Sequence, residues 1–360
     1  MLGIAQIIST QTRQPKPMNT EPKHIEDLIE HMPLPVCVLN SKRKLAITNK
    51  LCRSVFPNLT TGQDIAYFMR EPAFLDAIAK IIDDGLSAEV GIEELGPPKR
   101  YFNVSLSAAN QDNNNPNYVM LIFTDITLSK EDEKSRSAFV ANVSHELRSP
   151  LTTLMGSIET LQGPAKNDDA AQVRFLGLME QEAGRMKRIV DELLSLSKME
   201  IQAHLHPQDS VDIHGVLKRT CGVLDDQAQK KNMSIILDVP EHIPAVRGER
   251  DQLIQVFHNL VDNAIKYGDE NTDITIGASV GASHVELFVK NFGTVIPSEK
   301  LPRLTERFYR VDKSRSRDLG GTGLGLSIVK HIVNRHRGSI EIKSAKQDGT
   351  VFSISLPIAK

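Results

Sequence analysis

The sequence predicts a multidomain α+β protein with three folded parts in succession. A mixed pattern of short strands and helices occupies residues 23–128, two long amphipathic helical patterns occupy residues 129–205, and a second mixed pattern occupies residues 206–360. The chain has 360 residues and 40% hydrophobic content, enough for two or three domains that each bury a core. Residues 1–22 lack any such periodicity and are predicted to form a flexible tail.

The composition excludes several classes of protein. Lys and Arg number 43 against 45 Asp and Glu, so no strong field attracts nucleic acid or anionic lipid. The three cysteines form no Cys-x-x-Cys pair, which argues against a disulfide framework or a cysteine zinc site. No apolar stretch is long enough for a transmembrane segment, and the start of the chain lacks the features of a signal peptide. We therefore expect a cytoplasmic protein without a nucleic-acid partner.

Short strand patterns frame the first mixed region. Strands are expected at Val36–Leu39 and around Ala46 and Ile47, followed by a helix around Phe74–Ile82. Two further strands are expected at Tyr101–Leu106 and Tyr118–Phe123. This order indicates a small α+β domain.

Apolar residues recur at steps of three and four in the middle region, which predicts two helices joined near Gly163. The apolar positions are Phe139, Val143, Leu147, Leu151, Leu154 and Ile158 in the first helix, and Leu176, Ala183, Met186, Ile189, Val190, Leu193 and Leu196 in the second. Each helix alone would expose its stripe. The antiparallel hairpin is therefore expected to pair with a second copy as a dimeric four-helix bundle, which makes the protein a homodimer.

The last region alternates helices with strands, which predicts helices packed on one mixed sheet, an α/β sandwich. The expected elements are helices ending near Gln229, spanning Arg250–Tyr267 and starting near Gly323, and strands at Ser234–Val239, Ile274–Ile276, Val285–Val289, Ile340–Ile342 and Phe352–Leu356.

One histidine lies on the polar side of the first long helix. At about 100° per residue, His145 is about 200° from the apolar positions Val143 and Leu147, so it faces solvent. Ser149, four residues on, shares this face, and Glu146 is adjacent. A His-Glu-x-x-His zinc site is excluded, because Ser149 stands where the second histidine would be.

The segment Ser144–Pro150 resembles the phosphoacceptor motif of sensor histidine kinases. The resemblance implies that His145 accepts the γ-phosphoryl group of ATP and passes it to an aspartate on the receiver domain of a response regulator. Glu146 would take the ring proton and make the imidazole a better nucleophile. Ser149 replaces the Thr or Asn with which the family positions a water for dephosphorylating its partner, and its hydroxyl keeps this second activity plausible.

A helical block at Asn259–Tyr267 places polar residues along the edge of an apolar face. Asn259, Asn263 and Tyr267 follow one another at four-residue steps. The block is similar to the asparagine motif of the same kinase family. By that resemblance Asn263 and Asn259 would be the Mg²⁺ ligands, Lys266 would approach phosphate and Tyr267 would lie against the base.

A glycine cluster at Gly320–Leu326 opens the next helix, where free amides suit phosphate. It resembles the glycine-rich segment of the family's Bergerat-type ATP-binding domain, and Glu306–Arg310 resembles the phenylalanine motif. Between them, Lys313, Arg315 and Arg317 suggest a mobile basic lid. The region from Phe308 to Leu326 is most similar to phosphate-regulon-type sensor kinases. The resemblance implies nucleotide contacts from Arg310, Gly321, Thr322, Gly323, Leu324, Gly325 and Leu326.

The chain departs from the family at Asn291–Val295, where an Asp-x-Gly-x-Gly motif is usual. Asn291 can still accept a hydrogen bond from the adenine amine, and Gly293 keeps the first glycine. Val295 replaces the second glycine, so the turn must be rearranged if that position needs a positive φ. Weakened or altered ATP binding is expected.

Residues 24–128 resemble a PAS sensor domain, with Leu34–Leu39 as first strand and Ile122–Thr127 as its exit. Such domains bind small ligands or mediate dimer contacts, and the ligand here is unknown. Cys52 lacks the surroundings of a flavin-adduct cysteine, and His31 is expected to be structural rather than a haem ligand.

The resemblance thus predicts a sensor histidine kinase that uses ATP and Mg²⁺. The main alternative is a catalytically weak dimeric scaffold, or a phosphatase acting on a response regulator, and the turn at Asn291–Val295 separates the two. An ATPase of the gyrase or chaperone type is disfavoured, because Ser144–Pro150 would then have no purpose. Transfer in cis or in trans within the dimer stays open.

Overall fold

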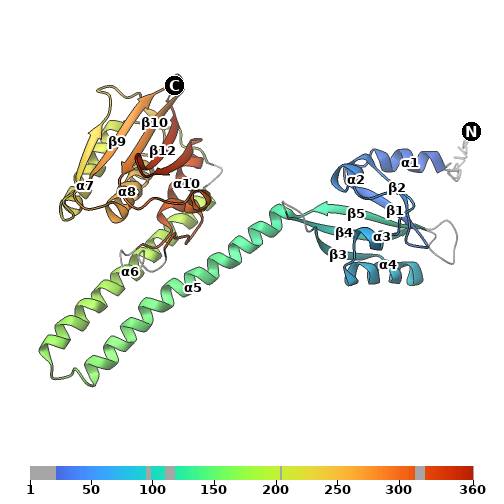
Figure 1. Ribbon diagram of the computed structural model, residues 1–360, viewed down its shortest axis with the longest axis horizontal. Helices are drawn as coiled ribbons and strands as arrows, with labels where there is room; N and C mark the ends of the chain where they lie inside the picture. Colours follow the sequence, from blue (N-terminus) through green and yellow to red (C-terminus); the bar gives the residue numbers. More distant parts are fainter. Residues whose placement is uncertain (1–21, 95–98, 110–117, 203–204, 313–320, 360) are drawn as a thin grey trace, which may run out of the picture. The chain divides into compact units, whose positions relative to one another are not determined.

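The structure is a computed structural model that describes residues 22–94, 99–109, 118–202, 205–312 and 321–359 (Figure 1). The tail predicted over residues 1–22 therefore lies outside the described residues except for its last position. The chain forms two compact units, residues 1–136 and 137–360. The boundary between them falls inside one long helix, α5 (Thr127–Gln162).

The first unit is an antiparallel five-stranded sheet in the order β2-β1-β5-β4-β3. Its strands are β1 (Val36–Asn40), β2 (Leu45–Thr48), β3 (Ala88–Glu94), β4 (Arg100–Ala109) and β5 (Tyr118–Asp125). Its helices are α1 (Pro22–Glu30), α2 (Lys50–Val55), α3 (Ile65–Phe68) and α4 (Pro72–Asp84).

The alternation of side chains in β1 gives this sheet two apolar faces. Val36 and Val38 pack with Ile29 of α1 on one face. Cys37 and Leu39 point to the other, which contacts residues of α2, α3 and α4. The latter core contains tilted and edge-on phenylalanine rings at centroid distances between 4.9 and 6.4 Å.

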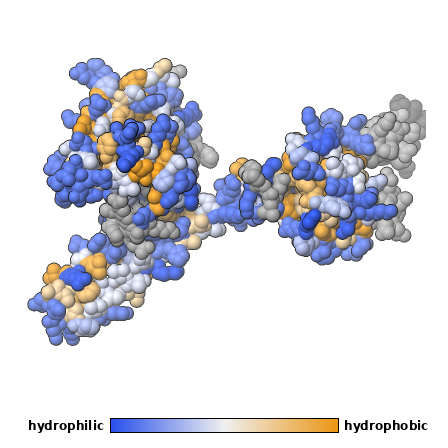
Figure 2. Space-filling view, in the orientation of Figure 1, coloured by the Kyte–Doolittle hydropathy of each residue, from blue (hydrophilic) through white to orange (hydrophobic). Residues whose placement is uncertain are grey.

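Helices α5 and α6 (Asp169–Ile201) form the expected hairpin (Figure 1). The Asp168 carboxylate caps α6 by accepting from the Ala171 N–H at 2.9 Å. Part of the hairpin's apolar surface is exposed, and orange and pale residues are visible on it in Figure 2. The exposed apolar residues include Leu151, Met155, Ile158, Val173, Leu176, Val190 and Leu194.

The rest of the second unit is an α/β sandwich. Its main sheet has the order β11-β12-β10-β9-β7, in which only β7 and β9 are parallel. The elements are β6 (Ser210–Val211), α7 (Ile213–Gln229), β7 (Ser234–Asp238), β8 (Val246–Arg247), α8 (Arg250–Tyr267), β9 (Asp273–Val280), β10 (His284–Asn291), the 3-10 helix η1 (Ser298–Thr305), α10 (Gly325–Arg335), β11 (Ser339–Ala345) and β12 (Gly349–Pro357).

One apolar core joins α7, α8 and α10 to this sheet. The face of α8 is buried at Leu253, Val256, Leu260 and Ala264, all 0% exposed, as the helical spacing predicts. The opposite edge of α8 is left free to carry polar side chains. No helix within the described ranges is both long and apolar enough to cross a membrane.

Candidate functional site

His145 is exposed on α5, as its position on the helix predicts. It lines a pocket of about 690 Å³ together with Glu146, Ser149 and Arg148 of the same helix. Phe308, which follows η1, also lines this pocket. The three residues assigned to catalysis from the sequence therefore line the same pocket from the same helix.

Glu146 is held by two arginines rather than left free beside the imidazole. Its Oε2 accepts from Arg185 of α6 at 3.0 Å, and its Oε1 pairs with Arg310. The side chains of Arg185 and Arg310 are only 8% and 5% exposed. Arg185 is not among the residues predicted from the sequence. The sequence nevertheless carried a signal for Arg185: it lies one helical turn before Ile189, so both residues are on the buried side of the amphipathic helix α6.

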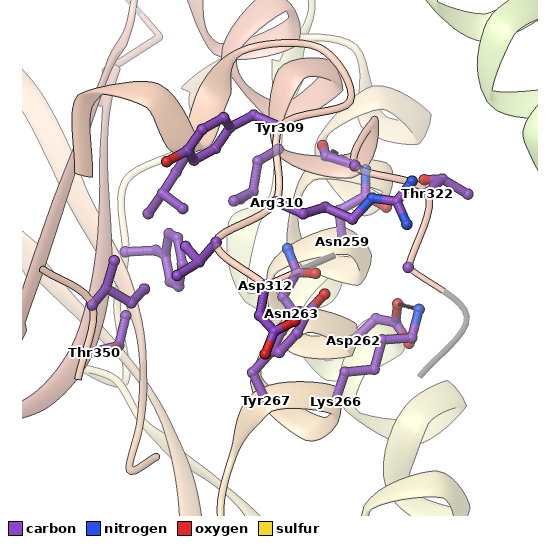
Figure 3. A pocket seen from close by; sticks show the side chains of 18 of the residues that line it. Asn259, Asp262, Asn263, Lys266, Tyr267, Tyr309, Arg310, Asp312, Thr322 and Thr350 are labelled. Carbon is purple, nitrogen blue, oxygen red and sulfur yellow. Dashed lines mark hydrogen bonds and ion pairs between the residues drawn. The ribbon is translucent and has the colours of Figure 1, made fainter. Parts of the chain in front are cut away.

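A larger pocket, of about 1040 Å³, lies against α8 in the same unit (Figure 3). Most of the residues assigned to nucleotide binding line it: Asn259, Asn263, Lys266, Tyr267, Asn291, Arg310, Gly321, Thr322, Gly323, Gly325 and Leu326. Two do not. A Cβ at Gly293 would come within 2.4 Å of the Tyr267 carbonyl oxygen, and Leu324 is fully buried.

Figure 3 shows Asn259, Asn263 and Tyr267 following one another along α8. The Asn259 amide donates to the Gly325 carbonyl oxygen at 3.4 Å, which connects α8 to the start of α10. Lys266 pairs with Asp262 at 2.6 Å. Asp262 lines the pocket too, although no role was predicted for it, and the four-residue step from Asp262 to Lys266 was its signal.

The glycine-rich segment and the phenylalanine motif pack directly against each other at the pocket. Gly323 has a φ of +77°, and a Cβ there would meet the Phe308 backbone at 2.9 Å. The Phe308 N–H donates to the Gly323 carbonyl oxygen at 2.8 Å, and Phe308 itself has a φ of 62°. Only glycine allows this close approach at position 323.

Helix α6 also lines the nucleotide-sized pocket, with Arg188, Asp191 and Glu192. The Thr322 hydroxyl donates to the Glu192 carboxylate at 2.5 Å. Burial raises the pKa of the Glu192 carboxyl, against the opposing effect of that hydrogen bond. No local motif marks these residues, because the hairpin reaches the pocket only through tertiary packing.

The turn after β10 accommodates Val295 without strain. Asn291 is 4% exposed and lines the pocket, and Val295 lines it as well. Neither Val295 nor Gly293 has a positive φ. The turn as the structure has it therefore does not require a positive φ at Val295.

Several other sequence expectations can be placed. Gly320 and the lid bases Lys313, Arg315 and Arg317 lie outside the described residues. Cys52 is fully buried in the first unit's core. Nδ1 of His31 lies 2.8 Å from the Asp27 carbonyl oxygen within its own turn, as expected of a structural histidine.

Two families match the chain. Residues 135–202 match the His Kinase A (phospho-acceptor) domain, and residues 248–360 match the histidine kinase-, DNA gyrase B- and HSP90-like ATPase family. The first match contains His145, and the second contains the asparagine and glycine-rich motifs.

The chain is similar to sensor protein kinase WalK from Staphylococcus aureus. It is 30% identical over 341 residues to the protein of strain Newman, covering 94% of this chain and 56% of that one. Another S. aureus WalK is 29% identical over 341 residues, with coverage of 94% and 81%. The chain thus spans little more than half the length of the first of these relatives.

Among solved structures, histidine kinase ThkA in complex with response regulator protein TrrA shares the fold, with a TM-score of 0.51 and 21% identity over 92% of this chain and 98% of that one. The two family matches and the WalK relatives agree with the motifs on α5, α8 and the start of α10. The chain therefore contains the phospho-acceptor domain and the ATPase domain of histidine kinases, and over most of its length it is similar to sensor protein kinase WalK.

Proposed function

We propose that this protein phosphorylates itself on His145 with the γ-phosphoryl group of Mg·ATP and then passes that group to an aspartate of a response regulator. One observation carries the proposal: Arg310 lines both the large pocket against α8 and the pocket beside His145. A single guanidinium therefore connects the place suited to a nucleotide with the phosphoacceptor.

The groups that line the large pocket can contact each part of a nucleotide. The amides at the start of α10 and Lys266 suit phosphate oxygens, Tyr267 suits the flat face of a base, and Asn291 suits the adenine edge. Asn263 and Asn259 would hold Mg²⁺ through their side-chain oxygens, and the ion would screen the phosphate charge. Within the described ranges, no cluster of three or more histidine, cysteine, aspartate or glutamate side chains is placed to hold a metal ion.

The transfer step needs a neutral imidazole. The unprotonated ring nitrogen of His145 attacks the γ-phosphorus, the N–P bond forms, and the bond from phosphorus to the bridging oxygen of ADP breaks. The proton on the other ring nitrogen passes to Glu146. Since Glu146 is paired with Arg310 and Arg185 here, we infer that Arg310 moves from the carboxylate to the phosphates before transfer.

The remaining parts of the chain fit a receptor of this class. We infer a homodimer formed by the exposed apolar residues of α5 and α6. We also infer a PAS-type sensor domain in the first unit, supported by its five-stranded antiparallel sheet with helices on both faces. Family membership supports a receiver domain as the phosphoryl acceptor.

Incubation with γ-labelled ATP and Mg²⁺ tests this function. We expect label that acid removes on the wild type and none on His145→Ala, because the N–P bond of phosphohistidine is acid-labile. Asn263→Ala should lose most of the label, whereas His242→Ala, an exposed histidine outside both pockets, should keep it. A folded, dimeric wild type without label would favour the scaffold or phosphatase alternative, for which Ser149 supplies the hydroxyl.

A further inference from the structure

The side chains that line the pocket beside His145 carry more positive than negative charge. Three arginines line it, Arg148, Arg185 and Arg310, against one carboxylate, that of Glu146. A hollow with such a surplus, next to an exposed imidazole, is suited to an anion.

Two of these arginines are built into the protein. The side chains of Arg185 and Arg310 are more than nine-tenths buried, so each has lost most of its water. Within the part of the chain that the structure describes, the buried Nε of Arg185 has no hydrogen-bond partner. A buried guanidinium donor without a partner is costly, and it indicates a ligand that the fold itself does not supply.

Glu146 shows what shape of anion fits. One carboxylate oxygen pairs with Arg185 and the other pairs with Arg310, so the carboxylate lies between two guanidinium groups. A phosphoryl group presents three oxygens and a charge of about −2, so two of its oxygens can take the places of the two carboxylate oxygens and the third remains for a further donor.

The two buried arginines differ in one respect. Arg310 also lines the nucleotide pocket and can therefore contact the phosphoryl group both before and after the transfer. Arg185 comes from α6 and lines only the pocket beside His145. Any contact that Arg185 makes with the phosphoryl group is thus a contact with the product.

We propose that Arg185 binds the phosphoryl group of phosphorylated His145, exchanging the Glu146 carboxylate for it, and so stabilises the phosphohistidine state. This inference rests on the proposed function. It makes α6 a chemical partner in the reaction as well as a packing helix.

The equilibrium of the transfer distinguishes this role from a structural one. A residue that only positions His145 changes the forward and reverse rates equally and leaves the ratio of phosphorylated to unphosphorylated protein unchanged. A residue that binds the phosphoryl group favours the phosphorylated form. The measurement is the fraction of phosphohistidine at equilibrium over a series of ADP-to-ATP ratios.

We expect Arg185→Gln to lower this equilibrium constant about tenfold or more, the effect of losing a hydrogen bond between charged groups. Arg174→Gln, an exposed arginine on the same helix outside both pockets, should match the wild type. Arg185→Lys keeps the charge but not the fork, and should give an intermediate constant even if the glutamine variant does not fold.

Arg185 variants that become phosphorylated with the wild-type equilibrium constant for phosphohistidine would overturn this inference and leave the kinase function intact. An equal loss in Arg174→Gln would overturn it as well, since the effect would then be unspecific. A wild type without label would instead overturn the proposed function, and this inference with it.

Discussion

At the scale of single residues, we expect the strength of nucleotide binding to depend on Asn291. It is nearly buried in the wall of the large pocket, where the family usually has an aspartate. Asn291→Asp would replace a neutral acceptor with a charged one, and hydrogen bonds to charged acceptors are stronger. We expect the Kd for ATP to fall about fivefold or more, because such bonds add about 1 kcal/mol or more.

Isothermal titration calorimetry of the two proteins measures this change. The matched control is Asn334→Asp, an exposed position near the end of α10 outside the pocket, which should leave the Kd unchanged. An equal Kd for Asn291→Asp and the wild type would contradict the adenine role of this side chain.

At the same scale, the sequence could predict residues that belong to local motifs. Asn259, Asn263 and Tyr267 share a helix edge, so their convergence on one pocket follows from helical spacing alone. Helical spacing places Arg185 on the buried side of α6, but it does not indicate which pocket Arg185 reaches, and it gives no signal for Glu192. They reach the two pockets because α6 packs against the ATP-binding part, a tertiary contact that no periodicity records.

At the scale of elements, His336 makes the junction after α10 sensitive to pH. Its Nε2 lies 3.0 Å from the Glu249 N–H, which can only donate, so Nε2 must be unprotonated and Nδ1 donates to the Ile332 carbonyl oxygen at 2.8 Å. Burial lowers the pKa of His336 below its ordinary value of 6.5. The unfolded chain therefore binds the proton more readily than the folded one.

It follows that the stability contributed by His336 is complete above about pH 6.5 and is lost as the pH falls through that value toward the lowered folded pKa. In urea unfolding at a series of pH values, the wild type should lose up to about 1.4 kcal/mol per pH unit in this window from this group. His336→Gln should have a shallower slope. Parallel slopes in the two proteins would refute the assignment.

The long elements were predictable because their patterns are long. Helix α8 begins at Arg250 and ends at Tyr267, as its apolar spacing predicts, and α5 and α6 follow their stripes. Elements without a clear pattern were missed. The β6–β8 pair has two residues in each strand, α3 has four residues, and β3 alternates weakly around Gly91, so none carries enough periodicity to be recognised.

At the scale of the whole molecule, the exposed apolar side chains of the hairpin predict a dimer. Met155 is 56% exposed between Leu151 and Ile158 on the same face of α5. Met155→Glu would bury a charge in the expected four-helix bundle, at a cost that paired helices cannot recover. We expect a shift from dimer to monomer at micromolar concentration.

Sedimentation velocity distinguishes the two states. Leu86→Glu is the matched control, because Leu86 is also an exposed apolar residue, 70% accessible, but lies in the first unit. It should remain dimeric. A wild type that sediments as a monomer would contradict the bundle.

On the proposed function, a nucleotide in the large pocket delivers its phosphoryl group to one histidine of this chain. The most direct measurement is tandem mass spectrometry, under alkaline conditions that preserve the N–P bond, of protein incubated with Mg·ATP. We predict phosphate on His145 and on no other residue. Phosphate on a different side chain, or an unmodified His145 in protein that binds ATP, would contradict the account.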